Sequence, residues 1–133
     1  MSDGDLPDIF DEQNREANHK PHRITARAVV CGLWTRLGEV TGEVQWTKRA
    51  QLLAAAVAPS IARYEYHNQM LDGIVAADRE FVDGEAACYV LEGLVPLYRV
   101  TRDPAVLALC QKAAAFAFGW TYFYDLPKAH RGI

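Results

Sequence analysis

Apolar residues recur every three or four positions along most of the chain, a spacing typical of amphipathic helices. The pattern predicts helices over about 25–37 and 43–63, a third from about 83, and a fourth from about 103 to 120. The first helix can be capped by Thr25, and its expected apolar face consists of Ala26, Val29, Val30, Leu33, Trp34 and Leu37. The apolar positions of the second helix include Trp46, Ala50, Leu53, Ala54, Val57 and Ile61, and those of the third are Ala86, Tyr89, Val90, Gly93, Leu94 and Leu97. The fourth helix has a wide apolar face that extends to Phe118, so we expect it to be well buried. No segment alternates in the way that predicts a strand, so the expected fold class is all-α.

Residues 25–65 repeat as residues 85–125 with a shift of 60. Nine positions keep the same residue, namely Ala26, Val30, Leu37, Val40, Thr41, Gln51, Ala54, Ala55 and Tyr64 of the first copy. A fixed period of this length indicates a repeated supersecondary unit, which cannot bury its apolar face alone. The chain is therefore predicted to contain two consecutive αα-hairpins, each closed by a Val-Thr-x-Asp/Glu turn at 40–43 and 100–103.

The rest of the chain is organised around these hairpins. A polar leader broken by two prolines precedes a helical-hairpin domain over 24–133. The expected divisions are the leader 1–23, hairpin 1 at about 24–64, a connecting segment 65–82, hairpin 2 at about 83–120 and an aromatic loop 121–133.

Composition narrows the classes of partner and compartment. The 133 residues are half hydrophobic with a net charge of -3, so we expect one domain and, without a basic stripe, no nucleic-acid partner. No apolar run approaches the roughly 20 residues of a membrane span, so no membrane partner is expected. Three cysteines without a CxxC pattern or secretion signal suggest reduced, buried thiols in a cytoplasmic protein. His19 and His22 lack a third ligand nearby, so neither a metal nor another cofactor is expected.

The second hairpin resembles a known architecture. Its segment LVPLYRVTRDPAVL (94–107), with Gln111-Lys112-Ala113-Ala114 and Trp120-Thr121-Tyr122 after it, is similar to hairpins of six-hairpin (α/α)-toroid carbohydrate-active proteins. Glycoside hydrolases, polysaccharide lyases and sugar epimerases share that toroid. The resemblance implies that the first and third helices are inner and the others outer. Two hairpins in place of six imply a fragment or a reduced family member, and Arg102 and Pro96 depart from the pattern.

The resemblance also places a candidate site. The two segments after the hairpins lie at the end opposite the Val-Thr turns, which in such toroids is the sugar-binding end. A glycosidase needs two carboxyl groups, one of them held protonated. The candidate catalytic residues are Glu65, Asp83 and Asp125. The candidate substrate-binding residues are Tyr64, Tyr66, His67, Trp120, Tyr122 and Tyr124.

Each candidate also has a structural interpretation. Asp83 suits the N-cap of the third helix. Glu65 and Asp125 follow a tyrosine at equivalent repeat positions, which fits a repeated contact between neighbouring hairpins. The aromatic residues fit a core or interface role as well as a sugar platform.

Three functions remain open from the sequence. The first is a carbohydrate-active toroid, or part of one, that binds a glycan or cleaves a glycosidic bond. The second is a non-catalytic helical-repeat module that binds a protein partner or self-associates. The third is a small four-helix bundle with its own pocket. In the first two, missing hairpins, a protein partner or another copy would cover apolar ends.

Overall fold

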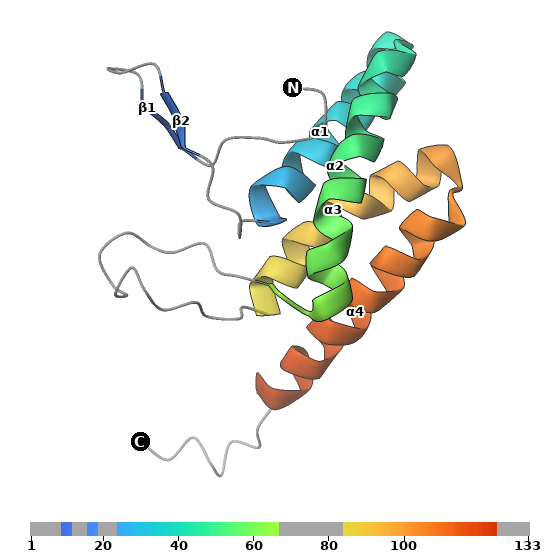
Figure 1. Cartoon of the computed structure of the whole chain (residues 1–133). Coiled ribbons are helices and arrows are strands. Elements are labelled where there is room, and N and C mark those ends of the chain that lie inside the picture. The colour runs from blue at the N-terminus through green and yellow to red at the C-terminus, as the bar shows by residue number, and fades with distance from the viewer. Residues whose placement is uncertain (1–8, 12–15, 19–23, 67–83, 125–133) are drawn as a thin grey trace.

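A computed structural model of the chain describes residues 9–11, 16–18, 24–66 and 84–124, with side chains for 24–66 and 84–119. Four helices make up almost all of this part: α1 (Ile24–Thr41), α2 (Val44–Arg63), α3 (Gly84–Thr101) and α4 (Pro104–Tyr124). Helix α1 packs against α2 and α3, and α4 packs against α3, so the two hairpins meet through α1 and α3 (Figure 1). The all-α fold class is confirmed.

The sequence repeat is a structural repeat. Helices α1 and α3 have 18 residues each, and α3 begins 60 residues after α1. Helix α4 likewise begins 60 residues after α2. The two turns share their hydrogen bonds as well. The hydroxyls of Thr41 and Thr101 donate to the carbonyls four residues earlier, at 2.8 and 2.9 Å. The same hydroxyls accept the backbone N–H groups of Glu43 and Asp103, at 3.2 and 3.3 Å.

The turns differ at their left-handed residue. Gly42 has a φ of 72°, and Arg102 occupies the equivalent position with a φ of 55°. A left-handed residue after a helix is usually glycine, because a side chain crowds the backbone there. Arg102 offsets part of that cost by placing its guanidinium 5.7 Å from the Tyr98 ring centroid. Asp103 then caps α4, since its carboxylate accepts the N–H of Ala105 at 2.8 Å.

The two hairpins are joined by an unusually close helix contact. A β-carbon placed on Gly93 of α3 would lie closer than 3.0 Å to the carbonyl group of Ala28 on α1. One placed on Gly32 of α1 would lie 3.1 Å from the α-carbon of Gly93. Small residues allow two backbones to approach this closely, where Cα–H groups face carbonyl oxygens. The positions of α1 and α3 relative to each other therefore depend on glycine.

The core lies between the four helices and is made of medium-sized apolar side chains. Its fully covered members include Leu53, Val57 and Ile61 from α2 and Val90, Leu94 and Leu97 from α3. The apolar faces expected on α2 and α3 are thus confirmed. The covered atoms belong to side chains from both hairpins, so burying this surface ties the two units together.

The expected face of α1 was wrong in part, since Val30 and Trp34 do pack against the core but are only partly buried. Its buried residues are Ile24, Thr25, Ala28, Cys31, Gly32 and Thr35. Val29 and Leu33 are instead 45% and 60% exposed. The physical reason is the glycine contact, because α1 turns its small residues toward α3 and leaves the larger apolar ones outside. Thr25 also lies within the helix, which begins at Ile24, and does not cap it.

Three further expectations need correction. Two short strands, β1 (Ile9–Asp11) and β2 (Glu16–Asn18), pair antiparallel within the leader, where no strand was expected. Helix α4 continues to Tyr124, so the first four residues of the expected aromatic loop are helical. No proline interrupts the helix before Pro127, so nothing in the backbone requires an earlier end. Phe118, expected to be buried with its helix, is 73% exposed.

Replacing Gly93 by alanine tests the dependence on the helix contact. We expect Gly93→Ala to lower the free energy of unfolding by about 3 kcal/mol, because backbone must move to admit the methyl group. Gly119→Ala is the matched control: its β-carbon would meet nothing within 4 Å, so we expect a gain of roughly 0.5 to 1 kcal/mol. Urea denaturation followed by circular dichroism measures both. Equal effects of the two substitutions would contradict the proposed role of Gly93.

Candidate functional site

The sequence-predicted site falls at the end where α2 and α4 finish. Tyr64 ends α2 with a φ of 58°, and its N–H and that of Glu65 donate to the carbonyls of Ile61 and Ser60. This is the hydrogen-bond pattern of a Schellman cap, with tyrosine in the position that glycine usually takes. The backbone therefore turns sharply here and directs Glu65 and Tyr66 away from the helix axis.

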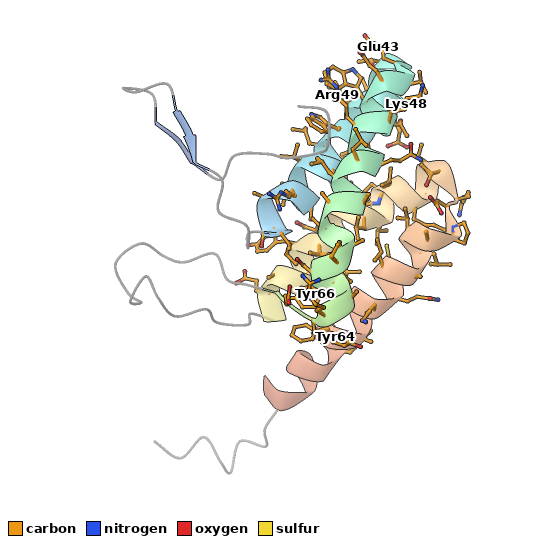
Figure 2. All side chains as sticks on the ribbon, in the orientation of Figure 1. Glu43, Lys48, Arg49, Tyr64 and Tyr66 are labelled. Atoms are coloured by element: carbon orange, nitrogen blue, oxygen red, sulfur yellow. The ribbon has the colours of Figure 1, made fainter. Side chains whose placement is uncertain are left out.

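Aromatic rings from both hairpins meet at this corner. Tyr64 and Tyr66 lie at the end of α2 (Figure 2). The Phe116 ring of α4 stacks on Tyr66 at a centroid distance of 4.4 Å and on Tyr64 at 6.0 Å. Lys112 of α4 donates to the carbonyl of Ala62 at 2.6 Å, and its ammonium group lies 4.4 Å from the Tyr64 centroid. These contacts join the end of α2 to the part of α4 before residue 121, so the expected meeting of the two segments after the hairpins stays a prediction.

The side chains at this corner differ in accessibility. Tyr66 is fully buried, its hydroxyl finds no hydrogen-bond partner among the described residues, and burial together with Tyr64 raises the pKa of Tyr66 to about 12. A fully buried ring cannot stack on a ligand without rearrangement, so Tyr66 has the surroundings of a core residue. Tyr64 is 47% exposed. Glu65 is held by Arg63 through two hydrogen bonds of 2.6 and 2.7 Å.

The structure brings only part of the predicted site together. Tyr64, Glu65 and Tyr66 are the three candidates whose side chains it describes. His67, Asp83 and Asp125 lie outside the described residues. Trp120, Tyr122 and Tyr124 lie on the last turns of α4, for which the backbone alone is described. Glu65 is therefore the one predicted catalytic carboxylate with a described environment, and that environment is an exposed ion pair.

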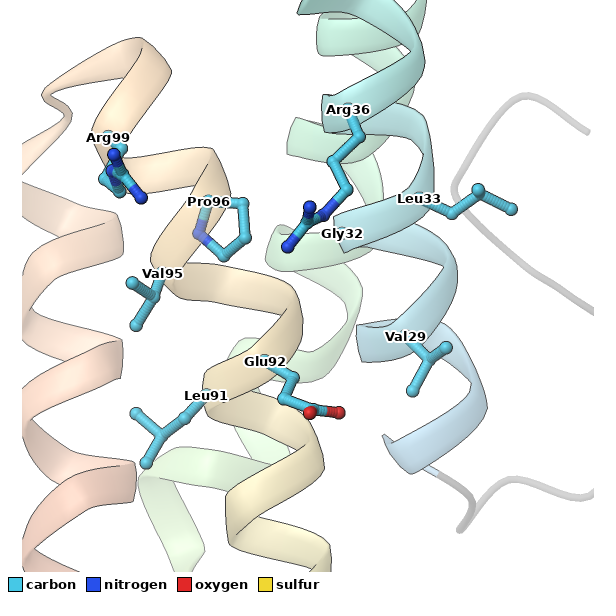
Figure 3. Close-up of a pocket in the computed structure, with 9 residues that line it drawn as sticks. All are labelled: Val29, Gly32, Leu33, Arg36, Leu91, Glu92, Val95, Pro96 and Arg99. Carbon is cyan, nitrogen blue, oxygen red and sulfur yellow. The ribbon is translucent and has the colours of Figure 1, made fainter.

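A second feature, which sequence reasoning missed, is a groove between α1 and α3 with a volume of about 590 Å³. Arg36 from α1 and Glu92 from α3 point into the space between the helices, and Pro96 lies beside them (Figure 3). Val29 and Leu33 line its α1 side. The groove combines apolar walls with charges of both signs, which suits a polypeptide surface better than a buried small molecule.

The α1 wall of the groove continues as a row of accessible apolar side chains. We call Ala26, Val29, Leu33, Leu37 and Val40 the α1 stripe. Leu33 is 60% and Val40 85% exposed, Ala26 is exposed and Leu37 is half-buried. Five apolar residues along one helix face form a contiguous patch of the kind that marks an interaction site.

Hairpin 1 also carries an aromatic cluster at its turn end. The Arg49 guanidinium lies 5.0 Å from the Trp46 ring centroid and 5.9 Å from that of Trp34. The sequence signal was the pair of tryptophans on either side of the predicted turn. Because Arg49 itself lies over both rings, the cluster stabilises the turn end of the hairpin.

The cysteines do not share one environment. Cys31 and Cys110 are buried, and Cys31 donates its thiol hydrogen to the carbonyl of Ala50 at 3.3 Å. Burial, followed by the neighbouring Cys110, raises the pKa of Cys31 to about 12. Cys88 is exposed, so the expectation of three buried thiols was wrong for this residue. It lies on the side of α3 that faces away from the core.

Comparison with known proteins gives no independent guide to the site. No family model matches the sequence, and searches of curated proteins and of solved structures found no significant match. None of the described helices is long and apolar enough to cross a membrane. Within the described residues there is no cluster of three His, Cys, Asp or Glu side chains placed to hold a metal.

The thiols give a direct test of these environments. With an aromatic disulfide reagent at mildly alkaline pH, we expect Cys88 alone to react quickly in the folded protein, and all three cysteines to react in denaturant. The raised pKa keeps Cys31 protonated, and its contribution to stability is lost only as the pH rises from about 9 toward 12. Cys88→Ala should abolish the fast phase. Rapid reaction of Cys31 in the folded chain would contradict its burial.

Proposed function

We propose that this chain is a non-catalytic helical-repeat module that binds another polypeptide through the α1 stripe. One observation carries the proposal. The residues 60 positions after the stripe are Ala86, Tyr89, Gly93, Leu97 and Val100, and three of these, Ala86, Gly93 and Leu97, are buried. Gly93 is the residue that contacts α1. The face that hairpin 2 uses to pack on its neighbour is thus the face that hairpin 1 leaves accessible.

The argument rests on the properties of repeat proteins. Each hairpin buries its apolar faces against the hairpins on either side, and an end without a neighbour needs a polar surface or a partner. Within the part of the chain that the structure describes, hairpin 1 packs against hairpin 2 through α3, and another face of α1 carries the α1 stripe. Covering Val29, Leu33 and Val40 would remove apolar surface from water, which is the main favourable term in protein association.

A photoreactive residue on the stripe tests this proposal in cells that make the protein. With p-benzoylphenylalanine in place of Leu33, we expect a discrete adduct with another polypeptide, since that side chain would lie within the interface. The same replacement at Leu52, which is 42% exposed on α2, is the control and should give no discrete adduct. Adding Val29→Glu should abolish the Leu33 adduct. Equal patterns from the two positions would contradict binding through the stripe.

Glycan binding at the α2 corner is the second candidate. It is favoured by the adjacent Tyr64 ring and Glu65 carboxylate, an apolar face and a hydrogen-bond acceptor at the accessible end of the helices. The carbohydrate-active toroid suggested by the resemblance belongs to this candidate, with Asp83 and Asp125 as its further carboxylates. In this reading the Arg63–Glu65 pair would hold the acceptor in place for a sugar hydroxyl.

Removing the charge of Glu65 tests the second candidate. If a glycan binds here, Glu65→Gln should weaken its binding about tenfold, as expected for loss of a charged hydrogen bond. Glu39→Gln, an exposed substitution near the other end of the hairpin, is the control. Binding and hydrolysis are measured on a panel of soluble polysaccharides. Absence of binding by the natural chain, or equal binding by both variants, would reject the glycan candidate.

A further inference from the structure

The α1 stripe has a spacing that reads the same in both directions. Its members are separated by three, four, four and three residues, with Leu33 at the centre. A helix that carries such a stripe can lie antiparallel on its own copy, with each residue meeting an apolar counterpart. The pattern is therefore self-complementary, which is what a symmetric pair of identical surfaces requires.

The other end of the molecule is unsuited to extending the repeat. In a head-to-tail assembly, the α1 stripe of a second copy would pack on α3 of the first copy, in the way that α3 packs on α1 within one chain. On α3 the residue equivalent to Gly32 is Glu92, and on α1 the residue equivalent to Gly93 is Leu33. The close backbone contact that joins the two hairpins needs glycine at position 93 and leaves little room for a side chain at position 32. The side chains of Leu33 and Glu92 would prevent the two helix backbones from approaching as closely. The Glu92 carboxylate would also lose its exposure to water.

We propose that two copies of this chain form a twofold-symmetric dimer through their α1 stripes, arranged antiparallel about Leu33. This inference rests on the proposed function and names its partner. Leu33 of one copy lies on the partner's Leu33, Val29 lies opposite the partner's Leu37, and Ala26 lies opposite the partner's Val40. The stripe is the repeat face that is buried in hairpin 2, where Gly93 lies against α1, and in the dimer the same face of α1 packs on its copy. It closes on itself, so the assembly stops at two.

The mass of the purified full chain in solution tests the dimer. Sedimentation equilibrium over a dilution series should give twice the 14.9 kDa of one chain at high concentration, falling to one chain on dilution. Leu33→Glu should shift the natural dimer to 14.9 kDa at every concentration, because it places two carboxylates together at the twofold axis. Leu52→Glu, at an exposed leucine of α2, should leave the dimer intact. Circular dichroism checks that both variants fold.

Cross-linking tests the geometry. In a Cys88→Ala background, oxidation of Leu33→Cys should give a disulfide-linked dimer, since the two positions face each other at the axis. Leu52→Cys in the same background should not. A monomeric natural chain, an assembly larger than two, or a dimer that survives Leu33→Glu would overturn the inference.

These outcomes are separable from those of the proposed function. A monomer in solution together with a Leu33 photo-adduct to a different polypeptide would overturn the dimer and leave the binding module standing. A monomer with no such adduct would overturn both. A photo-adduct with twice the mass of the chain would support both.

Discussion

The carbonyl group of Ala28 occupies the space where a side chain on Gly93 would begin, and the arrangement of the two hairpins depends on this contact. Because the backbones of α1 and α3 meet directly, α1 must direct its small residues, Ala28 and Gly32, toward α3. Rotating the helix in this way turns Val29 and Leu33 outward. The accessible stripe on α1 is thus a consequence of the helix contact, and the proposed function depends on it.

The two copies of the repeat have similar sequences but different neighbours. Helix α3 buries Ala86, Gly93 and Leu97, and Gly93 lies against α1. Helix α1 has α3 on one side and an apolar surface on the other. In a long array each unit would have equivalent contacts on both sides. The face of hairpin 1 that we propose to bind a partner is equivalent to a face that hairpin 2 largely buries.

Much of the architecture followed from local sequence. The Thr41 and Thr101 turns were predictable because each threonine hydroxyl pairs with backbone groups within four residues of chain, and Asp103 also caps α4. Local sequence did not predict which side chains of the candidate site are exposed. Tyr64 and Tyr66 are two residues apart and alike in type, yet the first is half exposed and the second is fully buried against Phe116. Their difference depends on α4, which is distant in sequence.

The amino-acid sequence by itself determined the helices, their pairing into hairpins and the positions of the turns, because periodicity, capping and glycine placement act over a few residues. The sequence also placed Gly93 inside a helix, where glycine is unusual. It did not show that the backbone of α1 packs against this glycine. Only the tertiary structure decided which face of α1 is buried, since that depends on how closely another helix approaches. Small residues lower the apparent hydrophobicity of a face while allowing the closest packing, so a face rich in alanine and glycine can be the one buried in place of leucine and valine.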